Sequence, residues 1–477
     1  MRVLIIGGLL LCLTNAATGM DPPAVEWERL YFPGYWSTFN SISETSDGGF
    51  AATMGTSVDS GYTMCRLSWT GDILWGARSG LDHQCGYSAT ELDNGDLIVT
   101  GWGRETPTSS VGVLLSKLDS AGQVIWTKLY NSGYPGSETG YSICLIPDGG
   151  FAVCGEIDPA EGMNQAWILR TDSQGDTLWT REWGWVMWDR ARRILCIDDV
   201  IIVLCSGRLE GDPGGTYIVR YSMDGDLLSE YWIPELIGKY GFDMCEAADG
   251  GLLILTNNSP TIAHTDYYGN VDWYSGPPYW DRDTAAYGWS IDTTMDGGII
   301  YGGENRYQPP GNNFDIDPSG MIVRMDYEGS FFWSDQVYNS GCIIIYSARQ
   351  LSQGGYIAAG QAWSSVNGMQ GFLIKYAPET GIESADLSPA VMITSVSPNP
   401  FSSSLSITCS LPSAMSASVT VYDLNGRIVD VVEDGCFLAG EHSVSWIPSS
   451  ELASGCYLIR LQTEIGTDVM NCVLLGD

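Results

Sequence analysis

The chain has 477 residues, 44% of them hydrophobic and 17% charged, which is a globular composition long enough for two or three domains. Its 57 acidic residues outnumber 22 basic ones, so the formal net charge at pH 7 is −35. Phosphate backbones and anionic lipid surfaces would repel such a chain, which disfavours nucleic-acid and membrane-surface binding.

The N-terminus has the pattern of a secretory signal peptide. Arg2 precedes the apolar run "VLIIGGLLLCL" (3–13), and small and polar residues follow it. Eleven apolar residues are too few for a membrane anchor, which needs about 20. We therefore expect residues 1–17 to be a cleaved signal peptide, no transmembrane segment in the mature chain, and a location outside the cell or on its surface.

A unit of about 50 residues then recurs seven times. Each copy has a tight turn of the "DGG" type, an apolar strand, a variable loop, and a third strand with a basic residue. In most copies a glycine follows five residues later and a tryptophan four residues after that, as in "TDSQGDTLW" (171–179). The turns begin at Asp47, Asp93, Asp148, Asp198, Asp249, Asp296 and Gln353. Asp caps such turns and Gly supplies the positive φ that closes them, so each unit reads as four short strands.

Seven four-stranded units predict an all-β fold, a seven-bladed β-propeller over residues 21–384. The seventh unit lacks its tryptophan strand, but "VEWERLY" (25–31) matches "VIWTKLY" (124–130). We therefore expect strand 25–31 to complete the last blade and close the ring. The recurring tryptophan is then core packing between blades and not a ligand site.

These repeats resemble those of secreted bacterial β-propeller proteins whose units run DGG(F/Y)-strand-G and then K/R-LDxxGxxxW. The resemblance covers residues 25–380 and implies the fold. It implies no particular activity, because propellers serve many functions.

Composition changes after Tyr376, and a linker at 385–390 leads to a separate unit, 391–477. The pieces "PNPF" (398–401), "VYDLNGRIV" (421–429) and "SGCYLIRL" (454–461) resemble the Ig-like C-terminal domain shared by type IX secretion sorting modules and flagellar-hook-cap proteins. The resemblance implies a small β-sandwich that engages the outer-membrane secretion machinery. The last strand, "NCVLLGD", lacks the basic residue that sorting modules commonly carry, so a plain spacer is the alternative.

Twelve cysteines follow the signal peptide, and most of them lie in apolar strand-like runs. We expect them to be small buried hydrophobic residues. Cys144 and Cys154, placed about one tight turn, are the candidate disulfide.

Ligand-binding candidates come from the face that carries the long loops and the connections between blades. Aromatic rings beside carboxylates suit a sugar or a peptide, because rings pack against C–H faces and carboxylates bind hydroxyls. The alternative is that these side chains cover seams between blades. Trp289 is excluded, since "GWS" (288–290) repeats "GYS" (86–88) and so looks structural. The candidates are Trp36, Trp102, Trp185, Trp188, Asp189, Trp280, Asp281, Tyr307 and Trp363.

Four of these candidates, Trp188, Asp189, Trp280 and Asp281, lie in two copies of the tripeptide "WDR", at 188–190 and 280–282. In each, the arginine is expected to hold the neighbouring carboxylate while the indole stays free to stack on a ligand.

Metal and catalytic chemistry have weaker signals. Asp315, Asp317 and Ser319 occupy calcium-loop positions, but Val323 stands where an oxygen ligand is needed, so an ordinary turn is favoured and no cofactor is expected. No residue is assigned a catalytic role. The predicted function is a secreted binding module for an extracellular glycan, peptide or protein. A glycan-cleaving hydrolase or lyase and a structural or adhesive surface component are the alternatives.

Overall fold

The computed structural model describes residues 20–57, 61–134, 136–159, 164–184, 189–207, 214–257, 260–276, 284–307, 318–337, 342–379, 392–399, 401–411, 415–422, 427–438, 440–449, 452–463 and 467–475. The expected signal peptide (1–17) and linker (385–390) lie outside these residues. The chain divides into two compact units, Met1–Glu379 and Thr380–Asp477. In the described residues of the first unit, β-strands are accompanied by one short 3-10 helix, η2 (Pro234–Leu236).

The strands of the first unit form successive antiparallel sets, in which strands adjacent in the sequence pair with one another. The first four sets are β2 (Ser37–Glu44), β3 (Phe50–Thr56), β4 (Met64–Leu67) and β5 (Ile73–Ala77); β6 (His83–Glu91), β7 (Leu97–Arg104), β8 (Gly112–Leu118) and β9 (Val124–Tyr130); β10 (Thr139–Leu145), β11 (Phe151–Ile157), β12 (Gln165–Thr171) and β13 (Thr177–Trp183); β14 (Arg190–Ile197), β15 (Val200–Gly207), β16 (Gly215–Ser222) and β17 (Leu227–Trp232). A single residue pair, Gly55 with Cys85, joins the first two sets into one sheet.

The remaining sets complete the unit. They are β18 (Gly241–Glu246), β19 (Leu252–Thr256), β20 (Ile262–Thr265) and β21 (Val271–Ser275); β22 (Thr284–Thr293), β23 (Ile299–Tyr307), β24 (Ser319–Met325) and β25 (Phe331–Val337); β26 (Ile343–Gln350), β27 (Tyr356–Ser364) and β28 (Gly368–Tyr376). In the last sheet the chain's first strand, β1 (Val25–Tyr31), pairs antiparallel with β28 and forms the outer edge.

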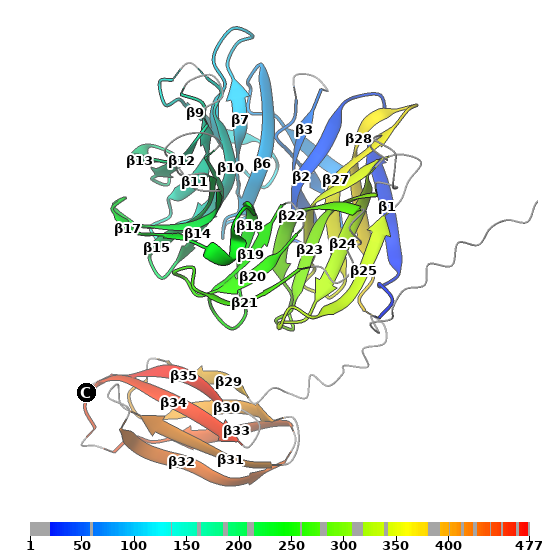
Figure 1. Ribbon diagram of the computed structural model, residues 1–477. Helices are drawn as coiled ribbons and strands as arrows, with labels where there is room; N and C mark the ends of the chain where they lie inside the picture. Colours follow the sequence, from blue (N-terminus) through cyan, green and yellow to red (C-terminus); the bar gives the residue numbers. More distant parts are fainter. Residues whose placement is uncertain are drawn as a thin grey trace, which may run out of the picture. The chain divides into compact units, whose positions relative to one another are not determined.

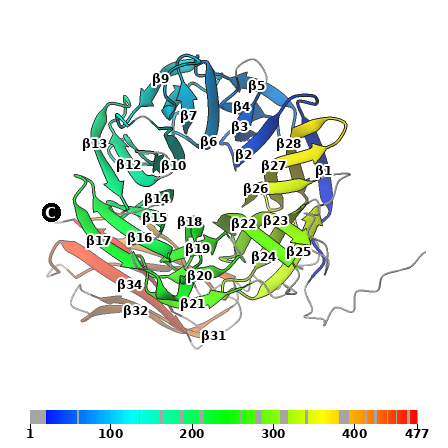
Figure 2. The ribbon, with the colours of Figure 1, turned by 45° about the horizontal axis from the view of Figure 1, so that its top comes forward.

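The sheets stand in a ring, with the first strand of each set innermost (Figures 1 and 2), which is the arrangement of a β-propeller. The hydrophobic core lies between neighbouring sheets. Ala152 and Ile168 of one sheet, for example, belong to the same buried cluster as Ile201 and Val203 of the next. No sheet buries its faces alone, so the ring is the unit that forms a core.

The recurring tryptophan and glycine meet across these seams. Gly122 has a φ of 81°, and a Cβ added to it would stand 2.6 Å from the indole of Trp75 in the preceding set. Gly329 meets Trp273 in the same way, at 2.7 Å. In the fourth set, where serine replaces tryptophan, Tyr231 takes the place of the indole against Gly269. The motif thus joins one sheet to the next.

The basic residue of the third strand binds the carboxylate of the "DGG" turn. Arg170, with a side chain only 1% exposed, pairs with Asp148 at 2.5 Å, and Arg324 pairs with Asp296 at 2.5 Å. His264 takes this position in its own copy and contacts Asp249 at 3.1 Å. These charged residues therefore hold strands and turns together.

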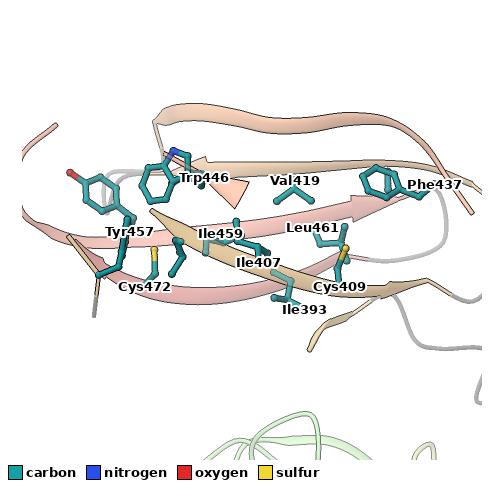
Figure 3. Close-up of a cluster of buried hydrophobic side chains, with 14 of the residues drawn as sticks. Ile393, Ile407, Cys409, Val419, Phe437, Trp446, Tyr457, Ile459, Leu461 and Cys472 are labelled. Atoms are coloured by element: carbon teal, nitrogen blue, oxygen red, sulfur yellow. The ribbon is translucent and has the colours of Figure 1, made fainter. Parts of the chain in front are cut away.

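The second unit consists of two antiparallel sheets around a common core. One sheet contains β29 (Met392–Ser397), β30 (Leu405–Leu411) and β33 (Gly440–Trp446); the other contains β31 (Met415–Tyr422), β32 (Ile428–Phe437), β34 (Gly455–Thr463) and β35 (Thr467–Leu474). Side chains from both sheets, among them Ile407, Val419 and Trp446, form one buried cluster (Figure 3). This unit thus has a hydrophobic core of its own.

Cys144 and Cys154 are free thiols, the first half-buried and the second buried. The expected disulfide between these two is wrong. The register pairs Cys144 with Ala152 and Cys154 with Ser142, so the two cysteines do not face each other across the hairpin.

Candidate functional site

Every inner strand of the ring carries a β-bulge at the same place. The pairing with the second strand skips one residue, which is left without a partner and departs from the strict alternation of side chains. The seven skipped residues are Asn40, Tyr87, Tyr141, Arg192, Phe242, Trp289 and Tyr346. All seven are half-buried. The bulges thus create a set of equivalent positions around the ring axis.

These seven residues line one cavity of about 830 Å³. Its walls also include Trp36, Arg190, Asn257 and Gln361, and the polar residues next to the bulges, such as Ser290 and Ser347. A mixture of aromatic rings, hydroxyls, amides and guanidinium groups in a cavity of this size is typical of a small-molecule or oligomer binding site.

The bulged side chains touch one another in succession. Tyr87 and Tyr141 are 5.5 Å apart between ring centroids, Phe242 and Trp289 are 4.8 Å apart, and Trp289 and Tyr346 are 5.3 Å apart. Each pair has the edge-to-face geometry that aromatic rings prefer. The rings therefore pack against one another along this part of the wall.

Arg192 stands between two of these rings. Its guanidinium carbon lies 5.0 Å from the centroid of Tyr141 and 4.6 Å from that of Phe242, within the range of cation–π attraction. Burial lowers the pKa of Arg192, because a charged group loses water there.

The other arginines of the cavity wall are paired with carboxylates. Arg190 contacts Glu156 at 2.5 Å, Arg193 contacts Asp243 at 3.4 Å, and Arg349 contacts Asp292 at 3.3 Å. Glu156 also accepts hydrogen bonds from Tyr141 and from Asn164. These charges cancel in pairs.

The residues after the bulges tie neighbouring inner strands together. The hydroxyl of Ser347 accepts a hydrogen bond from the backbone N–H of Ile42 at 3.3 Å, and Ser290 accepts one from Ala348 at 3.0 Å. Asp243 does the same for Ile291 at 2.9 Å. An inner strand would otherwise leave these N–H groups unpaired, so this part of the cavity wall is a structural requirement.

One of the residues predicted from the sequence lines the cavity, and a second contacts a lining residue. Trp36, at 45% exposure, lines it, and the Trp102 side chain of β7 forms a hydrogen bond with Tyr87, whose pKa burial raises to about 12. Trp363, at 42% exposure, is not among the described lining residues.

Asp189 and Arg190 are arranged differently from the hypothesis. Asp189 is fully buried, with its carboxylate packed against Gly184 and Gly207. Arg190 forms its ion pair with Glu156 and not with the neighbouring carboxylate.

The other candidates stay predictions. Trp185, Trp188, Trp280, Asp281, Asp315 and Asp317 lie outside the described residues, as does the side chain of Tyr307. Ser319 begins β24 and is buried. Within the described ranges, no group of three or more His, Cys, Asp or Glu residues is placed to hold a metal ion.

Trp289 was excluded on sequence grounds, yet it lines the cavity. The signal was present in the repeated tripeptides "GYS" and "GWS", whose middle residues are the bulged ones. A recurring position can have a structural role through its backbone while its side chain, which differs among several copies, lines the cavity.

Comparison with solved structures finds only distant similarity. YCF48 bound to D1 peptide is 12% identical, with a TM-score of 0.46 over 77% of this chain and 100% of that one. Puromycin hydrolase is 12% identical, with a TM-score of 0.44 over 78% of this chain and 58% of that one. A subtype N10 neuraminidase-like protein of A/little yellow-shouldered bat/Guatemala/060/2010 is 10% identical, with a TM-score of 0.38 over 60% and 93%. No curated protein matches the chain.

The C-terminal unit gives a clear match. Residues 395–474 match the family model of the secretion system C-terminal sorting domain, as the resemblance implied. In the described residues, no helix is long and apolar enough to cross a membrane. This domain marks proteins of the type IX secretion system, so the protein is secreted and is displayed at the cell surface or released.

Proposed function

We propose that this protein is a non-enzymatic binding module that holds an extracellular ligand, favoured to be a glycan, in the central cavity of its propeller. The observation that carries the proposal is the cavity of about 830 Å³ lined by successive aromatic side chains on equivalent bulges. Rings of this kind pack against the C–H faces of sugars, and the serine, asparagine and glutamine groups of the wall can bind hydroxyls.

The architecture that supports this function is proposed to be seven blades followed by an Ig-like domain. The seven inner strands with matching bulges and the pairing of β1 with β28 support seven blades closed by strand 25–31. The two sheets packed about Trp446 support the Ig-like assignment.

Binding is favoured over glycan cleavage because the carboxylate in the cavity wall is already bound by neighbouring residues. Among the described lining residues this is Asp243, which pairs with Arg193 and accepts backbone N–H groups from Met244 and Ile291, each at 2.9 Å. Glycoside hydrolysis uses two carboxylates that flank the bond to be cleaved. A carboxylate committed to neighbouring strands is poorly suited to that role.

The test is a glycan array probed with the secreted full-length chain and with Trp289→Ala. We expect the wild-type chain to bind a defined set of glycans and the variant to lose about tenfold or more in affinity, since an aromatic wall of the cavity is removed. Tyr274→Ala, at a 60% exposed position on the outer strand β21, is the control and should bind normally. Equal binding by all three proteins, or no binding to any glycan, would contradict the proposal.

A further inference from the structure

Arg192 differs from every other residue at the seven bulges. Five of the equivalent positions carry aromatic rings and one carries Asn40, so the scaffold does not require a charge there. An aromatic ring at this position would continue the edge-to-face series between Tyr141 and Phe242. The chain instead places a guanidinium between these two rings, in the cavity wall.

This guanidinium has no carboxylate partner among the described residues. Glu156 is near enough to favour its charge, but that carboxylate is bound to Arg190, Tyr141 and Asn164. The buried Nε–H of Arg192 also lacks a hydrogen-bond partner. A buried cation without a counter-ion is unfavourable, and two cation–π contacts offset only part of the lost hydration.

The geometry restricts what could pair with it. Aromatic rings cover the guanidinium on two sides, so a partner must approach its N–H groups from the cavity. The N–H groups of arginine form a planar fork that matches the two oxygens of a carboxylate. With three other arginines of the wall neutralised by Glu156, Asp243 and Asp292, Arg192 is the uncompensated positive charge among the described lining residues.

We propose that Arg192 binds the carboxylate of an acidic sugar, such as a uronic or sialic acid residue, in the central cavity. This inference rests on the proposed glycan-binding function and specifies the ligand class. The aromatic neighbours supply the apolar wall against which a sugar ring packs, and Arg192 supplies the charge that selects the acid over its neutral analogue. The net charge of −35 repels long polyanions, which favours a glycan with a single acidic residue at the cavity.

The experiment compares acidic glycans with their own methyl esters, which differ only in the charge of the carboxyl group. The full-length chain is tested on an array of such pairs, and affinities for bound pairs are measured by titration calorimetry. We expect the wild-type chain to prefer the acid by about ten- to hundredfold, the range of a charge-assisted hydrogen-bonded pair. Arg192→Gln should abolish this preference, and Arg192→Lys should keep part of it, because the charge remains while the planar fork is lost.

Arg78→Gln is the matched control. Arg78 also lies over an aromatic ring, 4.7 Å from the centroid of Tyr62, but it is exposed and outside the cavity wall, so its replacement should leave the preference unchanged. Thermal melts of each variant show whether it is folded. If Arg192→Gln does not fold, the comparison of acid with ester on the wild-type chain still tests the acid preference, and a reduced preference in Arg192→Lys tests the role of Arg192.

The outcomes separate this inference from the function on which it rests. Equal binding of acids and esters by the wild-type chain and by Arg192→Gln would overturn the role of Arg192 and leave glycan binding intact. No binding to any glycan would overturn the proposed function as well. Binding of peptides with a free C-terminal carboxylate, without any glycan bound, would also overturn the sugar assignment.

Discussion

At the scale of single residues, the repeat is explained by pairs that meet between sheets. Glycine closes the turn before the fourth strand with a positive φ and also leaves room for the indole of the preceding set. Two separate demands, one conformational and one steric, fall on the same residue. This is why the glycine recurs even where serine replaces the tryptophan and Tyr231 packs in its place.

The two demands can be measured separately. Gly122 and Gly48 both have a φ of 81°, but a Cβ at Gly122 would stand 2.6 Å from Trp75, whereas a Cβ at Gly48 would have no atom within 4 Å. Gly48→Ala should cost about 1 kcal/mol of unfolding free energy for backbone strain alone. Gly122→Ala should cost about 1–3 kcal/mol more, because the indole must move. Urea unfolding of both variants tests this; equal losses would show that the seam tolerates the extra carbon.

At the scale of elements, the turns between first and second strands depend on ionised carboxylates. The backbone N–H of Gly150 and the guanidinium of Arg170 hold the pKa of Asp148 below its ordinary value. A carboxyl group with a lowered pKa in the folded state contributes stability above its unfolded pKa of about 3.9, and this contribution is lost as the pH falls through the folded value.

The stability that the Asp148 turn contributes should therefore depend on pH. Asp148→Asn should lower the unfolding free energy by about 1 kcal/mol at pH 7, a modest amount because the Asp148 side chain is 61% exposed. The difference from the wild-type chain should shrink as the pH falls below the unfolded pKa of about 3.9 and on through the lower folded pKa, where Asp148 itself becomes protonated. Thermal melts across this range provide the measurement. A difference that stays constant down to pH 3 would mean that the ion pair is not the source of the stability.

The inner strands show how one element combines support and function. Residues after the bulge, such as Ser290 and Ser347, bind backbone N–H groups of the next inner strand. The bulged residue binds no such N–H group and differs between copies, from Asn40, whose amide donates to the carbonyl of Gly86 at 2.7 Å, to Trp289. A cavity with varied walls is thereby built on a repeated frame.

At the scale of the whole molecule, the chain consists of two compact units, each with its own hydrophobic core, and the second contains the sorting domain. The first has its core between sheets of the ring, and the second has a separate core about Trp446. Because the buried clusters of the first unit contain no residue of the second, removal of the second leaves its core complete.

Deletion of residues 391–477 should therefore leave the ring folded but keep it inside the cell envelope. The sorting domain at 395–474 is lost, and with it the address for export. Cell fractionation locates the truncated chain. Its melting temperature should lie within a few degrees of that of the ring in the full-length chain. Unchanged release would contradict the sorting role and favour a spacer; a large drop in melting temperature would contradict independent folding.

The sequence by itself determined the all-β class, the propeller, and the sorting tail. Each of these rests on local signals: turn glycines, alternating strands, the spacing of the repeat, and the pieces matched at 395–474. The match of "VEWERLY" to "VIWTKLY" even indicated the strand that pairs with β28. Local signals suffice because strands that are adjacent in the sequence pair with one another, except at the closure of the ring, where the repeat itself marks β1 as the missing strand.

Only the tertiary structure decided which side chains share the cavity. A bulge adds one residue to the inner strand and changes which side chains face the ring axis, so the period of two cannot be followed through it. The sequence alone therefore does not place Trp289 in the cavity wall, does not show that Asp189 is fully buried, and does not show that Cys144 and Cys154 are offset in their hairpin. Arg192 lies between Tyr141 and Phe242, each about 50 positions away in the sequence, only because the ring brings the inner strands together, and Glu156, which favours its charge, is already bound by Arg190.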